Sequence, residues 1–320
     1  MLLSIQHETK LMYSEPVSET VFEVRMAPPS NEDQTNLGYR LRITPGAPVT
    51  SYRDGFGNRV DLFNMLTSYR ELVVRATTVA RTHRRIGDVR LAEVAWNPDH
   101  AGAEALEFVQ PSPLVDHSPA LDEFVASLPY PSGSLLSVVQ TVIDAVRRRL
   151  KYEKKVTTAR TPVGEALELG RGVCQDYSHL FLGACRALGI PARYVSGYVH
   201  APGELATHAW CQVWADRSGW IDVDPTHGNF LDDNYVATAF GRDYSDVPPN
   251  RGVWKGLAEE TIHVAVKTEA LERMPHDWSE WGIGGPRAGD SWTQKAQHPR
   301  RFHGPKVQLG YRQQQGQQQQ

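Results

Sequence analysis

The chain has 320 residues, of which 40% are hydrophobic, and its formal net charge is −3 with a pI of about 6.5. This length allows two hydrophobic cores, so we expect two domains. Charges of both signs are mixed along the chain, which excludes the basic surface that nucleic-acid binding requires. The N-terminal residues lack a basic segment followed by a long apolar one, and no run of about 18 apolar residues occurs. We therefore expect a cytoplasmic protein without a membrane partner.

Residues 1–98 are predicted to form an N-terminal β-rich domain. Short runs of branched and aromatic residues alternate there with Pro, Gly, Asn and Asp, which is typical of an antiparallel sandwich or barrel. Between 52 and 59 the two glycines and the Asn predict a tight hairpin. The expected strands are 2–13, 20–26, 39–44, 49–52, 59–63, 71–81 and 89–95.

Residues 99–118 are predicted to be a linker, because periodicity fails and prolines cluster there. A second domain is expected over 119–281, opening with Ser118 as N-cap and Pro119 in the first turn of a helix. Apolar residues at helical spacing predict a further helix over 134–150. Residues 282–320 are rich in Gly, Pro, Gln and charge and end in a Gln-rich stretch, so we predict a disordered tail.

A helix is predicted over 174–188, with Gly189 and Pro191 ending it. Strands are then expected at 193–199, 208–215, 220–223 and 261–267, where aromatic and branched residues concentrate. Cys174 and Cys185 lie eleven positions apart on this helix, about 16 Å, which excludes a disulfide between them. Three cysteines in all favour a reducing compartment and free thiols.

Cys174 is the candidate nucleophile. A glycine-rich turn precedes it, and a thiol at a helix start meets the positive end of the helix dipole and unpaired N–H groups. A lone free cysteine is more often a packed apolar residue, and we accept that interpretation for Cys185 and Cys211. For Cys174 the glycine turn and the polar Gln175 and Asp176 predict an exposed helix start instead.

His208 and Asp224 are the candidate base and orienting carboxylate. Period-two alternation places His208 and Asp224 on matching faces of two strands that a hairpin at 216–219 can pair. Asp222 shares that face, but Asp224 is favoured because Pro225 ends the strand after it. Together with Cys174 they have the order of a nucleophile, a base and an orienter.

A zinc site formed by Cys174, His208, Cys211 and His227 is an alternative use of these residues. The opposed faces of His208 and Cys211 argue against it. A peptide-binding module without chemistry is a second alternative, since fold does not dictate function. No acidic loop with calcium-ligand spacing is present, so we expect no cofactor, no metal and no dependence on calcium.

Several segments together resemble the bacterial transglutaminase-like proteins of the papain-like cysteine peptidase superfamily. These are 172–179, 189–198, Thr207-His208-Ala209-Trp210 and 219–226. The first domain is similar to the β-rich domain that precedes the catalytic domain in many bacterial members, and 241–249 is similar to a segment of the same subgroup. Tyr235 is a departure, because a histidine is expected there in close relatives, which puts in doubt a second histidine near the triad.

The resemblance implies an α+β fold, with helices packed on an antiparallel sheet in the catalytic domain. It also implies cysteine-dependent acyl transfer through a thioester on Cys174. Water as acceptor would make the chain a cysteine protease or amidase acting on a peptide or protein substrate, and an amine acceptor would make it a transglutaminase. We favour hydrolysis. The backbone N–H of Cys174 is expected to be one oxyanion donor.

Overall fold

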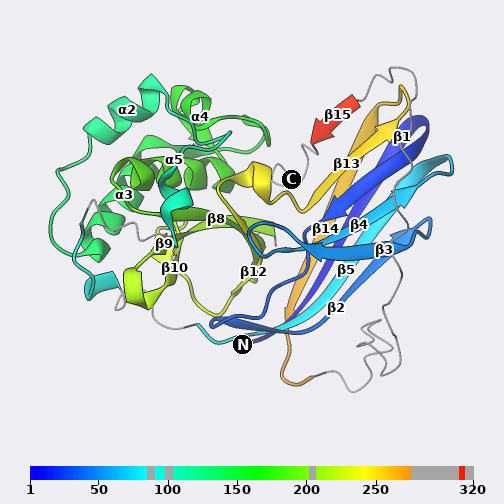
Figure 1. Cartoon of the computed structure of the whole chain (residues 1–320), viewed down its shortest axis with the longest axis horizontal. Coiled ribbons are helices and arrows are strands. Elements are labelled where there is room, and N and C mark those ends of the chain that lie inside the picture. The colour runs from blue at the N-terminus through cyan, green and yellow to red at the C-terminus, as the bar shows by residue number, and fades with distance from the viewer. Residues whose placement is uncertain (85–90, 98–103, 202–206, 275–309, 314–320) are drawn as a thin grey trace.

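The computed structural model describes residues 1–84, 91–97, 104–201, 207–274 and 310–313. The helices gather at one end of the molecule and the longest strands at the other, with strands β8 to β12 between them (Figure 1). The predicted α+β class is confirmed. Within the described ranges, no helix is long and apolar enough to cross a membrane.

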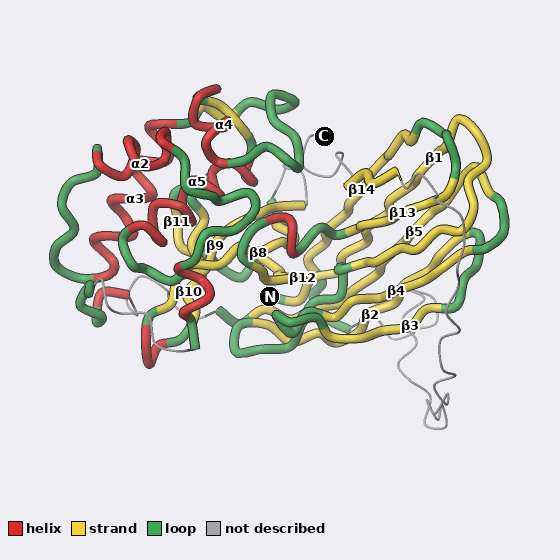
Figure 2. Tube along the Cα trace, turned by 45° about the horizontal axis from the view of Figure 1, so that its top comes forward, coloured by secondary structure: helices red, strands yellow, loops and turns green. Residues whose placement is uncertain are grey.

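The N-terminal part is built on one long strand, β1 (Leu2–Val24). Its first half pairs antiparallel with β5 (Tyr69–Thr82) and β14 (Glu260–Ala270), and its second half with β4 (Arg59–Met65) and β13 (Asn250–Lys255). The long strands run side by side along this end of the molecule (Figure 2). The remaining strands of the sheet are β2 (Gln34–Thr44) beside β5, β3 (Val49–Arg53) beside β4, and β15 (Gly310–Gln313) beside β13.

Alternating residues of these strands face inward and form one apolar core. Phe22 of β1 stacks on Phe63 of β4 with ring centroids 5.2 Å apart, while Trp254 of β13 packs edge-on against Tyr13. Residues of β2, β3 and β14 cover this core from its edges. The two halves of β1 therefore contribute to a single buried cluster, as a sandwich-like domain requires.

The last two strands of the second expected domain pair with the N-terminal sheet. Strands β13 and β14 lie within 119–281, yet β14 pairs with β1 from Leu3↔Ala270 to Tyr13↔Glu260. The alternation along β14 predicted a strand correctly, but period two carries no information about the partner. Residues 250–270 therefore belong to the N-terminal sheet, and the chain crosses between the two parts twice.

Three other boundaries from the sequence differ. The expected strand 89–95 is wrong: of its described residues, 91 and 92 are helical, 93 and 94 lie in a turn and a bend, and Ala95 forms only a single bridge with Ser134. In the expected linker 99–118, residues 99–103 lie outside the description, and a 3-10 helix follows at η1 (Leu106–Val109). Within the tail that was expected to be disordered, β15 is a strand, and the other residues after 274 lie outside the description.

The described residues of the second part include the four helices α2 to α5. Helix α2 (Pro119–Ala126) opens as predicted, since the Ser118 hydroxyl accepts a hydrogen bond from the Leu121 N–H at 3.3 Å. Helix α5 (Cys174–Ala187) is the central one, and its residues from 174 to 186 are all buried. The other two helices are α3 (Leu135–Arg149) and α4 (Val163–Leu169).

Helix α5 packs on a five-stranded antiparallel sheet in the order β11-β10-β9-β8-β12. Its apolar stripe meets the sheet face that carries Ala209, Cys211 and Val213, within one core. The strands of this sheet are β8 (Ala192–Val199), β9 (Thr207–Trp214), β10 (Trp220–Asp224), β11 (Asn229–Phe230) and β12 (Tyr235–Gly241). The short elements are β6 (Lys151–Tyr152), β7 (Arg171–Gly172), η2 (Asp216–Ser218) and η3 (Tyr244–Asp246).

Two side-chain amides of the N-terminal part bind the outer edge of β12. The Gln34 amide donates to the Ala237 carbonyl at 2.9 Å and accepts from the Ala237 N–H at 2.8 Å. The Asn58 amide does the same at Phe240, at 2.7 and 2.8 Å. Each amide therefore takes the place of a neighbouring strand at a sheet edge.

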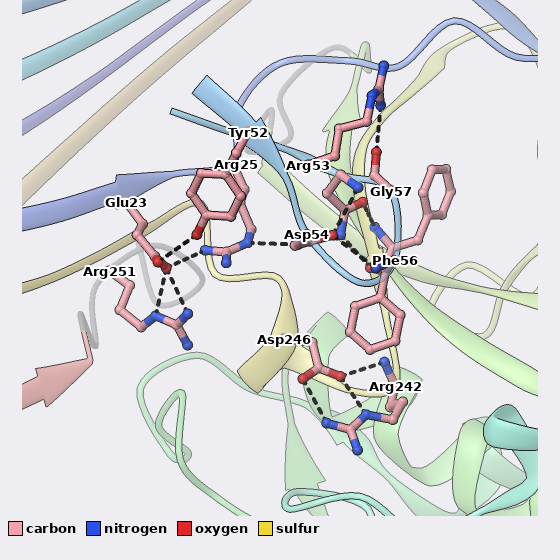
Figure 3. Close-up of polar contacts among 12 residues, drawn as sticks. Glu23, Arg25, Tyr52, Arg53, Asp54, Phe56, Gly57, Arg242, Asp246 and Arg251 are labelled. Carbon is pink, nitrogen blue, oxygen red and sulfur yellow. Dashed lines mark hydrogen bonds and ion pairs between the residues drawn. The ribbon is translucent and has the colours of Figure 1, made fainter. Parts of the chain in front are cut away.

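Asn58 is held in place by the hairpin that the sequence predicts between β3 and β4. The Asp54 carboxylate accepts from the Phe56 N–H at 3.1 Å, from the Asn58 N–H at 3.0 Å and from the Asn58 side chain at 3.1 Å (Figure 3). Arg25 donates to the same carboxylate at 3.3 Å. This network fixes the amide that reaches β12.

Candidate active site

Cys174 is placed by the turn that joins α4 to α5. Gly170 ends α4 in the left-handed conformation, with φ +65°, as a helix C-terminus favours. At Gly172 a Cβ would lie 2.4 Å from an Asp176 carboxylate oxygen, so only glycine allows this approach. That oxygen accepts from the Val173 N–H at 2.7 Å. The carboxylate thereby fixes the first turn of α5.

Cys174 is 5% exposed, so the prediction of an exposed helix start is wrong. The segment before α4 covers the helix terminus: Thr157 donates its hydroxyl to Asp176 at 2.7 Å, and the Gln175 amide donates to the Thr158 carbonyl at 3.3 Å. Burial raises the pKa of Asp176 to about 6, against the hydrogen bonds from Thr157 and Val173 that lower it. Asp176 thus has a structural role, because it binds both Thr157 and the backbone at the start of α5.

His208 and Asp224 meet where β9 and β10 lie side by side. His208 is near the start of β9, and Asp224 is the last residue of β10. Their side chains are joined by a hydrogen bond of 2.7 Å between Nε2 and Oδ2, and both are buried. The matching faces that alternation predicts are therefore present.

Asp222, the other carboxylate on that face, bonds other side chains. It accepts from the Trp210 indole at 2.7 Å and from the Gln212 amide at 2.9 Å, and it forms an ion pair with Arg84. None of these contacts involves His208. Of the two candidate orienters, Asp224 alone bonds the imidazole.

The Cys174 side chain lies beside His208, since its interaction with the imidazole is one of the causes that raise the pKa of His208. Since Nε2 of His208 is bonded to Asp224, Nδ1 is the nitrogen left for the thiol. Burial lowers the pKa of His208, but the Asp224 carboxylate and Cys174 outweigh it and raise this pKa to about 10. The imidazole can therefore hold a proton at neutral pH between a carboxylate and a sulfur.

Both oxygens of Asp224 are fully engaged. Oδ1 accepts from the backbone N–H groups of Thr226 at 2.8 Å and His227 at 3.1 Å. Oδ2 accepts from His208, from His227 Nδ1 at 2.6 Å and from the Tyr235 hydroxyl at 3.0 Å. Burial would raise the pKa of Asp224, but its interactions with His208 and His227 hold it well below the usual range. Asp224 therefore stays charged beside the His208 imidazole.

The sequence interpretation did not foresee the roles of His227 and Tyr235. His227 was considered only as a metal ligand, and Tyr235 was noted as the loss of a histidine near the triad. In the structure His227 and Tyr235 both bond the same carboxylate oxygen of Asp224. Hydrophobic periodicity gives no signal for either contact, because His227 lies in a turn and Tyr235 at a strand end.

The four ligands of the zinc alternative do not lie together in the structure. Within the part of the chain that the structure describes, the group whose ligand atoms lie within 4.8 Å of one another is His208, Asp224 and His227, which contains no cysteine. The Cys211 thiol lies on the other face of the sheet, 3.5 Å from the Ser178 carbonyl of α5. Burial raises the pKa of the Cys211 thiol, as expected of a packed cysteine.

The segment 241–249 had no role from the sequence, and it brings Tyr244 close to Cys174. The backbone N–H of Tyr244 donates to Nε2 of His179 on α5 at 3.2 Å. The tyrosine is buried, and its pKa is raised by burial and, to a smaller extent, by its interaction with Cys174. His179 therefore ties this segment to the helix that begins with Cys174.

Comparisons with known proteins show the family to which the chain belongs. Residues 124–225 match the family described as the transglutaminase-like superfamily, and residues 3–81 match the bacterial transglutaminase-like N-terminal region. An uncharacterised protein of Mycobacterium tuberculosis is 30% identical over 282 residues, which cover 81% of this chain and 89% of that protein. An uncharacterised Mycobacterium leprae protein is 28% identical over 283 residues, 84% of this chain and 99% of its own length.

Two further similarities concern proteins with a described activity. A protein-glutamine gamma-glutamyltransferase of Pseudomonas aeruginosa is 31% identical over 107 residues, which are 28% of this chain and 16% of that protein. The crystal structure of a candidate cysteine protease from Cytophaga hutchinsonii superposes with a TM-score of 0.71 at 22% identity. The superposition covers 86% of this chain and 93% of that one, so the two share a fold.

Proposed function

Since the chain belongs to the transglutaminase-like superfamily, we propose that it is a cysteine-dependent acyl-transfer enzyme that hydrolyses an amide bond in a peptide or protein. Cys174 is the nucleophile, His208 the general base and acid, and Asp224 the orienter. The observation that supports this most is the buried 2.7 Å hydrogen bond between His208 and Asp224, together with the interaction of Cys174 with the same imidazole. The order of roles is that of a catalytic triad.

In the first half-reaction the Cys174 sulfur attacks the carbonyl carbon of the amide. The oxyanion forms at the start of α5, where the first backbone N–H groups of a helix have no intrahelical partner, and the N–H of Cys174 is one donor. His208 then gives its proton to the amide nitrogen, the C–N bond breaks, and the amine leaves. A thioester on Cys174 remains.

In the second half-reaction His208, now neutral, takes a proton from water while the water oxygen attacks the thioester. The C–S bond breaks, the carboxylic acid leaves, and the sulfur and protonated imidazole are restored. Asp224 keeps its charge through both steps, because its oxygens are held by five hydrogen bonds. This fits a carboxylate that stabilises the imidazolium without being protonated.

A transglutaminase reaction is the second candidate, and the similarity of 107 residues to a protein-glutamine gamma-glutamyltransferase favours it. It uses the same thioester with an amine in place of water. We keep hydrolysis as the main proposal, with a peptide or protein as substrate.

The three free, buried cysteines support a reducing compartment such as the cytoplasm.

Product analysis distinguishes the two acceptors. Purified protein and its Cys174→Ala variant are incubated with a mixed glutamine-containing peptide library and a biotinylated primary amine, and the products are identified by mass spectrometry. Hydrolysis predicts new peptide termini or deamidated glutamine in the wild-type reaction alone, without incorporated amine. Incorporated amine supports the transglutaminase instead. Undiminished amide cleavage by Cys174→Ala would falsify the assignment of the nucleophile.

A further inference from the structure

We propose that His227 is a positioning residue of the catalytic pair: it fixes the rotation of the Asp224 carboxylate and shields it from solvent, so that His208 keeps Nδ1 for the thiol. The inference rests on the proposed function, because it concerns the same site. It adds to the triad a residue that acts through Asp224 and does not touch the substrate.

His227 holds both oxygens of Asp224. Its backbone N–H donates to Oδ1 at 3.1 Å and its Nδ1 donates to Oδ2 at 2.6 Å. The second contact is as short as a charge-assisted hydrogen bond. Two-point attachment by one residue stops the carboxylate from rotating about its Cβ–Cγ bond. The 2.7 Å contact from Oδ2 to His208 is thereby fixed in direction.

Among the three side chains that bond Oδ2, His227 is the one that reaches solvent. The side chain of His227 is 33% exposed, whereas that of Asp224 is 0% exposed, and His208 and Tyr235 are buried. The imidazole of His227 lies 5.0 Å from that of His208, ring centre to ring centre. Its ring therefore covers the Asp224–His208 contact on the solvent side. Removing the ring admits water to Oδ2, and the higher local dielectric weakens the attraction between carboxylate and imidazolium.

The turn that carries His227 is itself fixed. The Gly228 N–H closes it with a 2.8 Å bond to the Asp224 carbonyl, and Gly228 adopts φ +79°. A Cβ at this position would lie 2.2 Å from the guanidinium of Arg147, so the turn packs directly against α3. The backbone therefore holds the His227 ring on the carboxylate.

The test compares His227→Ala with His227→Asn, which can still donate from a side-chain amide, and with His263→Ala on β14 as a matched control. His263 is exposed on the N-terminal sheet. The rate of alkylation of Cys174 by iodoacetamide is measured for each variant, together with kcat, KM and the melting temperature. We expect His227→Ala to lower kcat and the alkylation rate by about 10- to 100-fold, with KM changed less than about twofold.

His227→Asn should recover part of both rates, and His263→Ala should match the wild type. The inference is overturned if folded His227→Ala alkylates and turns over at the wild-type rate, or if only its melting temperature falls. Alkylation needs no substrate, so it separates this inference from the proposed function. A wild type that alkylates rapidly at Cys174 but neither cleaves nor transfers an amide contradicts the function alone.

Discussion

Asp224 is a carboxylate without solvent contact, and burying such a charge is costly unless hydrogen bonds replace its water. Here five donors from Thr226, His227, His208 and Tyr235 do so. The result is an orienting group that remains charged in a dry site. In turn it keeps the buried imidazole of His208 protonated, which burial alone would prevent.

The His208 imidazole makes the stability of the fold depend on pH. Its pKa rises from 6.5 to about 10 on folding, so it stabilises the fold fully below pH 6.5 and loses that contribution as the pH rises toward 10. The Asp224 pKa is lowered, so its contribution is present above its ordinary value of 3.8 and is lost as the pH falls below that value. Between pH 5 and 6.5 both contributions are present.

We therefore expect wild type to have a larger free energy of unfolding than His208→Gln. The difference should be largest at pH 5 to 6.5 and should shrink steadily up to about pH 10. Urea denaturation of both proteins at pH 5, 7 and 9 measures it. A difference that stays constant or grows with pH would contradict the raised pKa.

At the residue scale the sequence predicted which side chains meet better than it predicted how buried they are. Strand alternation was enough to pair His208 with Asp224, because the two strands are adjacent and their register is set by a short hairpin. The burial of Cys174 was not predictable, because it depends on Thr157 and its neighbours crossing the helix start from another part of the chain. His227 was equally hidden, since turn contacts have no period.

Strand β12 shows at the element scale how the two parts of the molecule are joined. It is the last strand of its sheet, and its outer edge is buried against the N-terminal part. Gln34 and Asn58 satisfy the backbone groups of Ala237 and Phe240 there. A strand edge that is covered in this way offers no site for pairing with another chain.

Asn58→Ala removes both bonds to Phe240 and leaves its N–H and carbonyl unpaired. Because Asn58 is 3% exposed, we expect the free energy of unfolding to fall by about 2 to 4 kcal/mol. Asn64→Ala, at an exposed position of β4 in the same sheet, should change it by less than about 0.5 kcal/mol. Equal effects of the two substitutions in denaturant unfolding, or an unchanged hydrogen-exchange rate at the Phe240 amide, would argue against this role.

Among the elements, those with strong local patterns were predicted well and those defined by a distant partner were not. The hairpin at Asp54 and helices α2, α3 and α5 carry their own caps, turns and apolar stripes. Strand β14 also has a clear alternation, but its pairing with β1 joins residues more than 240 positions apart. Sequence distance of that size cannot be bridged by patterns that extend over a few residues.

On the scale of the whole molecule, the N-terminal part supports the active site. Arg84, at the end of β5, forms a buried ion pair with Asp222 and donates to the Tyr235 carbonyl at 3.1 Å. Its backbone N–H also bonds Asp233 at 2.9 Å. Tyr235 in turn bonds Asp224, so the N-terminal part is connected to this carboxylate of the candidate site through Arg84 and Tyr235. The N-terminal part and the part that carries the candidate site are therefore joined by direct contacts.

If His208 activates Cys174 as a nucleophile, the thiol must react rapidly with an alkylating reagent. The rate of iodoacetamide labelling at neutral pH is measured in wild type and His208→Ala, with the modified cysteines identified by peptide mass analysis. Cys185 and Cys211, both 0% exposed, are internal controls. We expect rapid modification of Cys174 alone in wild type. In His208→Ala the modification of Cys174 should be slower by about tenfold or more. Slow labelling of Cys174 that His208→Ala leaves unchanged would contradict it.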